Sequence, residues 1–135
     1  PILCVEDSML LSHLVMDGLK KAGYTNVRRV RNGQEALDYM NEIRAAGKSV
    51  KDNIACVISD IEMPVMDGHR LTKLMQEDED LQDIPVVIFS SLINEQLLRV
   101  GKQLGAVGQF SKPELFELIM FVDRITGAHQ AGAYR

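Results

Sequence analysis

The chain has 135 residues, of which 46% are hydrophobic and 25% are charged, and its formal net charge is −4. This length and composition fit one globular domain with a buried core. The negative charge disfavours nucleic acid as the main partner, because a phosphate backbone binds to a basic surface. No apolar stretch approaches the ~20 residues that span a membrane and no signal peptide is visible, so we expect no membrane partner.

Apolar runs and amphipathic segments alternate five times along the sequence. The runs predict strands at residues 2–5, 26–30, 54–59, 86–90 and 107–111. Apolar residues at helical spacing predict helices at about residues 11–22, 36–43, 68–77, 97–104 and 116–125. We expect one domain at residues 1–126 and a frayed tail or linker at residues 127–135, where the periodicity stops.

The first, third and fourth apolar runs lack the alternation of a half-exposed strand. Strands of that kind are buried on both faces, as in a parallel sheet covered by helices. Five alternating strand–helix units therefore predict an α/β fold with a doubly wound parallel sheet. Ligands in such sheets bind beyond the carboxyl ends of the strands.

Polar and charged residues follow four of the five predicted strands. Glu6 and Asp7 come after the first strand, and Asp60 comes after the third. The fourth strand ends in Ser90, and Lys112 follows the fifth. Each residue alone has a simpler interpretation as a helix cap, a turn former or a surface charge. Their shared position predicts one site at the carboxyl edge of the sheet.

Three carboxylates in one small site repel one another and titrate as a coupled set. A divalent cation removes the repulsion, and Mg²⁺ typically binds one or two carboxylates, water and a phosphate oxygen. A carboxylate can also attack phosphorus and hold an acyl phosphate. The cluster therefore predicts a Mg²⁺ cofactor and room for a phosphoryl group, with Lys112 supplying a cation and Ser90 a hydroxyl donor.

These segments resemble the receiver domain of two-component response regulators over about residues 2–126. The resemblance rests on the acidic pair, the D-x-x-M-P motif at residues 60–64, the M-D-G at 66–68, the serine, and the Lys-Pro pair at 112–113. It implies a CheY-like, flavodoxin-like (βα)5 sheet with strand order 2-1-3-4-5. The Lys-Pro peptide bond is often cis in that family.

The resemblance also implies a role for each residue of the site. Asp60 is the expected phosphoacceptor, which takes its phosphoryl group from a phosphohistidine of a sensor histidine kinase. Asp7 and Asp60 are expected to bind Mg²⁺ directly, with the backbone carbonyl of Glu62 as a third ligand. Glu6 is expected to act mainly through a metal-bound water. Such a domain is a stoichiometric phosphoacceptor rather than an enzyme.

A narrower resemblance is to the receiver domain of the chemotaxis protein CheV. It rests on residues 57–64, 66–72, 89–95 and 111–114. In CheV a CheW-like coupling domain precedes the receiver, and the chain begins directly on an apolar strand, which suggests a piece of a longer protein. The implied donor is then the chemotaxis kinase CheA. Kinase docking in this family lies largely on the first helix, where the candidates are His13, Met16 and Asp17, although an ordinary surface is an equally good interpretation.

One position departs from the family pattern. Many receivers carry an aromatic switch residue where this chain has Gln109, and the adjacent Phe110 should point to the other face of the strand. We expect Gln109 to stay near the surface, and the signal to pass from Ser90 to the loop at residues 91–94 and the following helix.

The main alternative is a small Mg²⁺-dependent aspartyl-phosphate phosphatase of the haloacid dehalogenase type. Those enzymes place D-x-D after the first strand, whereas this chain has Glu6 and Asp7 there and D-x-E at Asp60. A flavin-binding module is excluded because the acidic pair would repel the flavin phosphate. A receiver used only for docking is disfavoured because every phosphorylation residue is present.

Two further features concern location and partners. Cys4 and Cys56 lie inside apolar runs and form no disulfide framework, which favours a reducing cytoplasm. The three histidines lie far apart and match no metal-ligand spacing. The basic group at residues 28–31 is interpreted as a solvated strand edge in preference to a docking patch.

Overall fold

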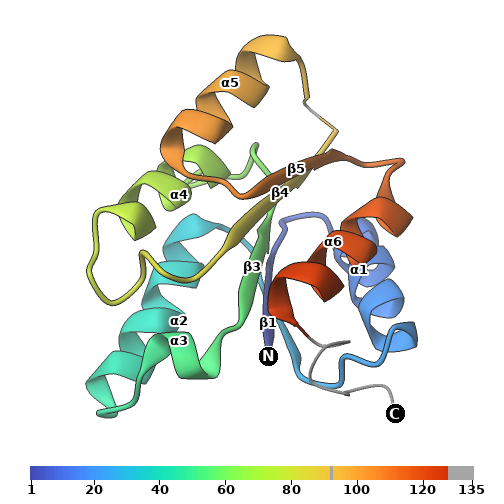
Figure 1. The fold of residues 1–135 in the computed structure, drawn as a ribbon. Helices are drawn as coiled ribbons and strands as arrows, with labels where there is room; N and C mark the ends of the chain where they lie inside the picture. Colours follow the sequence, from blue (N-terminus) through green and yellow to red (C-terminus); the bar gives the residue numbers. More distant parts are fainter. Residues whose placement is uncertain (92, 128–135) are drawn as a thin grey trace.

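The computed structural model describes residues 1–91 and 93–127. Its centre is one five-stranded sheet of order β2-β1-β3-β4-β5, and every pair of neighbours is parallel (Figure 1). The strands are β1 (Ile2–Val5), β2 (Val27–Val30), β3 (Cys56–Ser59), β4 (Val86–Ser90) and β5 (Gly108–Ser111). The predicted fold class and the predicted strand order are both confirmed.

Helices cover both faces of this sheet, so that three layers result. They are α1 (Met9–Lys21), α2 (Gly33–Ala45), α3 (Val50–Asn53), α4 (Gly68–Gln76), α5 (Glu95–Leu104) and α6 (Leu115–Thr126). Helices α1 and α6 pack side by side on one face, and α2, α4 and α5 lie on the other (Figure 1). The four-residue α3 was not predicted, because a single turn carries no measurable periodicity.

The helix ends follow from local capping chemistry. The side chains of Ser8, Asn32, Asp67 and Asn94 each accept a hydrogen bond from a backbone N–H of the first turn of α1, α2, α4 and α5. Such caps satisfy N–H groups that the helix itself leaves unpaired. Helix α5 is capped at its C-terminus by Gly105, whose φ of 104° lies in the left-handed region that glycine tolerates.

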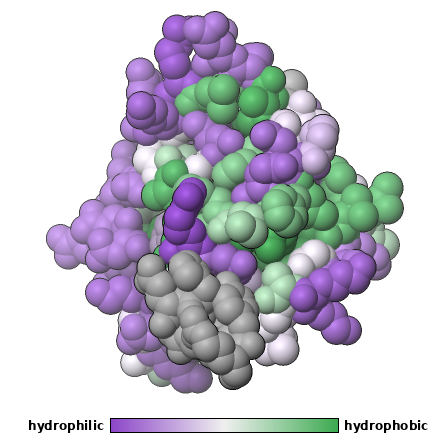
Figure 2. All heavy atoms as spheres, turned by 45° about the vertical axis from the view of Figure 1, so that its right-hand side comes forward, coloured by the Kyte–Doolittle hydropathy of each residue, from purple (hydrophilic) through white to green (hydrophobic). Residues whose placement is uncertain are grey.

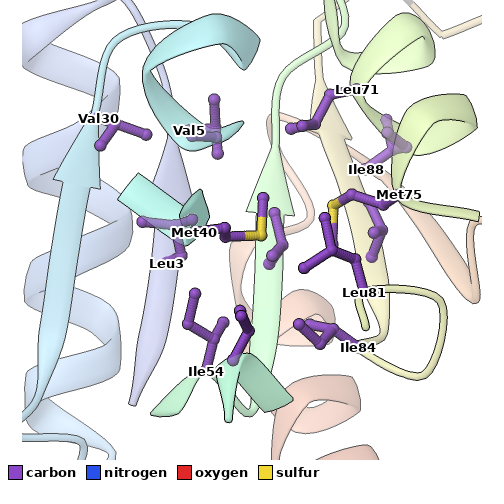
Figure 3. Close-up of a cluster of buried hydrophobic side chains, with 14 of the residues drawn as sticks. Leu3, Val5, Val30, Met40, Ile54, Leu71, Met75, Leu81, Ile84 and Ile88 are labelled. Carbon is purple, nitrogen blue, oxygen red and sulfur yellow. The ribbon is translucent and has the colours of Figure 1, made fainter. Parts of the chain in front are cut away.

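The hydrophobic core is divided by the sheet into two parts. On the α2 and α4 side, side chains of the strands pack against Met40, Leu71 and Met75, all fully buried (Figure 3). On the α1 and α6 side, they pack against a second set that includes Leu19 and Leu118. Each buried side chain of this size contributes on the order of 1.5–3 kcal/mol. This packing fixes the strands whose carboxyl ends carry the site.

Some boundaries and details differ from the sequence-based expectations. The second, third and fifth strands begin one or two residues later than predicted, which is the usual uncertainty of element ends. Among the described residues every peptide bond is trans, including the Lys112–Pro113 bond that the resemblance allowed to be cis. The expected tail lies, from residue 128 onward, outside the described residues. No helix in the described part of the chain is both long enough and apolar enough to cross a membrane.

Candidate phosphorylation site

Three of the predicted site residues meet directly at the carboxyl edge of the sheet. Lys112, which follows β5, places its Nζ 2.6 Å from Oε1 of Glu6, which follows β1. The same Nζ lies 3.9 Å from Oδ2 of Asp60, which follows β3. In strand order 2-1-3-4-5 the ends of β1 and β3 are neighbours, and β4 separates them from β5. The long Lys112 side chain therefore reaches past the end of β4 to meet Glu6, 106 residues away in the chain, and Asp60. The structure therefore forms a cation held between two acids.

Glu6 is the most buried of the acids, with 4% of its surface exposed. Its Oε2 accepts a hydrogen bond from the backbone N–H of Ser8 at 3.1 Å, so both carboxylate oxygens are engaged. Burial raises the pKa of Glu6 above its usual value. The bonds from Lys112 and Ser8 oppose that shift, while the nearby Asp60 charge adds to it. A cation near this carboxylate therefore favours its ionised form.

Asp60 is held by two backbone groups, one from β1 and one from the next residue of the chain. Its N–H donates to the Val5 carbonyl at 3.0 Å, and its Oδ1 accepts from the Ile61 N–H at 2.7 Å. Helix α4 approaches closely here: a Cβ at Gly68 would overlap the Asp60 carbonyl oxygen. With Oδ1 committed to the backbone, Oδ2 is the oxygen that faces Lys112.

Asp7 and Glu62 are both exposed, and each follows one of the buried acids closely in the chain. Asp7 lies in the turn between β1 and α1, and Glu62 lies in the loop between β3 and α4. In that loop Val65 has a φ of 68° and is 81% exposed. A β-branched residue rarely adopts this left-handed conformation, so the loop carries local strain.

Ser90 ends β4 as predicted, and it is 1% exposed. Ile88, two residues earlier, belongs to the core on the α2 and α4 side, so Ser90 points to that face. The register pairs Ile88 with Gln109 on β5, which places Gln109 on the same face as the serine. Phe110 packs instead against the α1 and α6 side, with its ring 5.4 Å from that of Phe121. The predicted offset of the aromatic residue is confirmed.

Gln109 lies against α5 instead of standing free in solvent. The residue is half-buried, and its Nε2 donates to the Leu98 carbonyl at 2.8 Å. Its Oε1 is buried and has no hydrogen-bond partner among the described residues. A Cβ at Gly101 would overlap this amide, so the glycine of α5 makes room for it. The expectation of a surface position therefore holds only in part, because the amide joins β5 to α5.

The oxygen-rich donor set of this edge suits Mg²⁺. Within the residues that the structure describes, no three His, Cys, Asp or Glu side chains form a ready-made metal cluster. The expected ligands include only two side chains, Asp7 and Asp60, with the Glu62 carbonyl and water completing the set. Mg²⁺ characteristically uses few carboxylates and keeps several waters. The residues present thus fit this ion in number and in chemistry.

Arg29 is a residue of this region whose contacts were not anticipated. Its guanidinium hydrogen-bonds the carbonyls of Glu6 and Asp7 from β2. The sequence interpretation placed it in a solvated basic edge. Arg28 leaves the opposite face of β2 and lies over the Tyr39 ring, and Arg31 lies beyond the end of the strand. The three arginines carry the same charge, so the sequence did not single out the one that contacts these carbonyls.

Comparison with known proteins places the chain in a large family. The chain is 31% identical over 115 residues to the polar-differentiation response regulator DivK of Brucella anthropi, covering 83% of each chain. It is 30% identical over 117 residues to the probable methanogenesis regulatory protein FilR2 of Methanothrix harundinacea, covering 86% of this chain and 74% of that protein. With chemotaxis protein CheV3 of Helicobacter pylori it shares 27% identity over 126 residues, which are 93% of this chain but 39% of CheV3.

Solved structures agree with these sequence relatives. The receiver domain of a signal transduction histidine kinase from Syntrophus aciditrophicus superposes with a TM-score of 0.79 at 30% identity, covering 94% of this chain and 89% of that one. The phosphorylated cyanobacterial phytochrome response regulator RcpA gives 0.74 at 28% identity, covering 94% and 91%. The family model for the response regulator receiver domain matches residues 2–122. The chain therefore belongs to the response regulator receiver domain family.

Proposed function

We propose that this domain accepts a phosphoryl group on Asp60, with Mg²⁺ as the cofactor. The observation that carries the proposal is the position of Lys112 between the carboxylates of Glu6 and Asp60, 2.6 Å from the first and 3.9 Å from the second. A lysine in that position can balance the negative charge of an acyl phosphate. RcpA, a structural relative at 28% identity, was solved in a phosphorylated form.

The chemistry starts from the oxygen that the backbone leaves available. Oδ1 of Asp60 is bound to the Ile61 N–H, so Oδ2 attacks phosphorus. The bond from phosphorus to the donor nitrogen breaks, and its electron pair stays on the imidazole that leaves. Lys112 can shift from Glu6 toward the new phosphoryl oxygens, and the Ser90 hydroxyl can donate to one of them.

Mg²⁺ would be held by Asp7, Asp60 and the Glu62 carbonyl, with Glu6 acting through water. When bound, it neutralises the acids and the charge on the transferring group. The domain would then accept one phosphoryl group per molecule, as a stoichiometric acceptor and not as an enzyme with turnover. We propose that this domain spans residues 1–126.

The signal is proposed to leave the site through Ser90. Its movement toward a phosphoryl oxygen would shift α5 and the β4–α5 connection at residues 91–94, of which residue 92 lies outside the described residues. A local charge that selects between two packings is a common switch design. Gln109 holds α5 through the Leu98 carbonyl and therefore fixes the resting position from which the helix moves.

The donor is proposed to be a sensor histidine kinase, and in a CheV-type protein the chemotaxis kinase CheA. The similarity to chemotaxis protein CheV3, which spans 39% of that protein, supports the CheV-type assignment. In a CheV-type protein a CheW-like domain would precede this receiver, as the sequence resemblance implies. Of the docking candidates on α1, His13 and Asp17 are exposed and Met16 is half-buried. Figure 2 brings the α1 and α6 side forward and shows hydrophobic residues gathered on it. Helix α1 exposes the side chains of Leu10 and Leu14, and helix α6 exposes those of Phe116 and Met120. Buried, unpaired thiols at Cys4 and Cys56 support a cytoplasmic location.

The test is intact-protein mass spectrometry after incubation with acetyl phosphate. We expect a mass gain of one phosphoryl group in Mg²⁺ and none in EDTA. If the same mass gain occurs in EDTA, the proposed requirement for Mg²⁺ is wrong. Sustained hydrolysis of an unrelated phosphate ester would favour the phosphatase alternative. For the donor, purified phosphorylated CheA should transfer to the domain faster than acetyl phosphate does; slower transfer would exclude it.

A further inference from the structure

Arg29 reaches from β2 to the turn that carries both acids. The register pairs it with Cys4, so its side chain leaves the sheet on the α1 and α6 side. From there its Nε donates to the Glu6 carbonyl at 3.1 Å, and its Nη2 donates to the Asp7 carbonyl at 3.0 Å. Guanidinium donors form a rigid planar fork. One group therefore ties two successive carbonyls of the turn to the neighbouring strand.

The two acids of this turn are fixed to different degrees. The Glu6 backbone N–H donates to the Val30 carbonyl at 3.0 Å, and the Glu6 side chain is buried against Lys112 and Ser8. Asp7 is exposed, and the bond to its carbonyl comes from Arg29. The guanidinium thus acts most on the residue expected to bind the metal directly.

We propose that Arg29 is a positioning residue for the Glu6–Asp7 turn. By holding both carbonyls, it keeps the Asp7 carboxylate oriented toward the mouth of the site before a cation arrives. A ligand that is ordered in advance loses less conformational entropy on binding. This inference rests on the proposed Mg²⁺ site, and it assigns to the basic group of β2 a function other than docking.

The charge of Arg29 and its positioning role predict opposite effects on Mg²⁺ affinity when the residue is replaced, which makes the proposal testable. A guanidinium close to a cation site repels Mg²⁺, so loss of its charge alone should tighten binding. Loss of the planar fork should instead weaken Mg²⁺ binding, because mutation of a residue that orients a metal ligand typically lowers metal affinity by about 10-fold or more. Arg29→Lys separates the two, because the ammonium keeps the charge but cannot reproduce the planar fork.

The experiment is Mg²⁺ titration by calorimetry on the full chain, comparing wild type, Arg29→Lys and Arg29→Gln. Arg31→Gln is the matched control, since it removes one positive charge from the same basic group and leaves the turn untouched. We expect both Arg29 variants to bind Mg²⁺ roughly 10-fold more weakly, and Arg31→Gln to bind no more weakly than wild type. In metal-free protein, the amide hydrogens of Asp7 and Ser8 should exchange faster in the Arg29 variants only.

Each other outcome decides against a specific claim. Wild-type affinity in Arg29→Lys, or tighter binding in Arg29→Gln, would show that only charge matters and would overturn the inference. Weaker binding with unchanged amide exchange would overturn it too, because the turn would then be ordered without Arg29. If the wild-type chain itself does not bind Mg²⁺, the proposed metal site and this inference both fall. Equal affinities across the panel would remove the inference alone.

Discussion

Lys112 makes a 2.6 Å ion pair with Glu6 in a setting where both side chains are largely buried, 12% and 5% exposed. Lys112→Met removes the cation but keeps much of the apolar stem. A buried carboxylate left without its partner typically costs about 3–5 kcal/mol. We therefore expect a loss of this order in the free energy of unfolding at neutral pH, measured by urea denaturation. Lys51→Met is the control, because the Lys51 side chain is 60% exposed and its distance to Asp83 is a longer 3.9 Å. This variant should change the free energy of unfolding by less than about 0.5 kcal/mol.

The pH dependence of this variant follows from the raised pKa of Glu6. An acid whose pKa is higher in the folded state retains its proton there after the unfolded state has lost it. Its burial therefore costs stability as the pH rises from the unfolded value through the folded value, and costs nothing below both. In Lys112→Met the folded pKa of Glu6 should rise further, so the deficit should shrink as the solution is acidified. A deficit that is constant with pH would contradict this assignment.

Gly68 is predicted to be irreplaceable because α4 begins against the Asp60 carbonyl. A methyl group there overlaps backbone, which cannot rotate away as a side-chain tip can. Gly68→Ala should therefore lose about 1–3 kcal/mol of stability. Gly18→Ala is the control: its Cβ would meet Ile119 and Leu115 side chains at 3.6 Å, an ordinary contact, and alanine favours the helix. Equal stabilities of the two variants, by urea denaturation, would refute the packing argument.

Val65 should be a site where a substitution stabilises the protein. Its φ of 68° is unfavourable for a β-branched residue, whereas asparagine tolerates it. With 81% of the residue exposed, little packing is lost. Val65→Asn should raise the unfolding free energy by about 0.5–1 kcal/mol. Val107→Asn, at a half-exposed position with ordinary backbone, should not; a gain in both, or in neither, would show that strain is not the cause.

Signal transmission is predicted to depend on Ser90 and to survive loss of the Gln109 amide. Beryllofluoride, which mimics the phosphoryl group, should shift the NMR signals of residues 91–104 in the wild type. Ser90→Ala should blunt that response. Gln109→Ala should change the resting signals near Leu98 and Gly101, since their contacts with the amide are lost, while the response to beryllofluoride remains. If the response disappears in Gln109→Ala although Asp60 still binds the mimic, Gln109 is itself the switch.

The sequence was sufficient for the parts of the fold that follow from local patterns. Continuous apolar runs identified buried parallel strands, and polar residues at their ends identified the edge that carries Glu6, Asp60 and Lys112. Strand order came from the family resemblance, since periodicity says nothing about which strands are neighbours. The short α3 was missed because one turn has no period.

The finer contacts of the site could not be predicted, because they join side chains across the tertiary structure. The fork of Arg29 depends on which face of β2 it leaves, and its neighbours Arg28 and Arg31 carry the same charge. The position of the Gln109 side chain depends on the space left by Gly101 of α5. In the sequence alone, a glycine inside a helix indicates only a weaker helix. Neither contact has a signature in spacing or composition.

The central claim, that Asp60 itself takes the phosphoryl group, is tested most directly by one variant pair. Asp60→Asn removes the nucleophilic oxygen, and Asp67→Asn removes an equal charge nearby while retaining a side chain able to cap α4. After incubation with acetyl phosphate and Mg²⁺, intact mass spectrometry should show one added phosphoryl group on the wild type and on Asp67→Asn, and none on Asp60→Asn. Full labelling of Asp60→Asn would contradict the account.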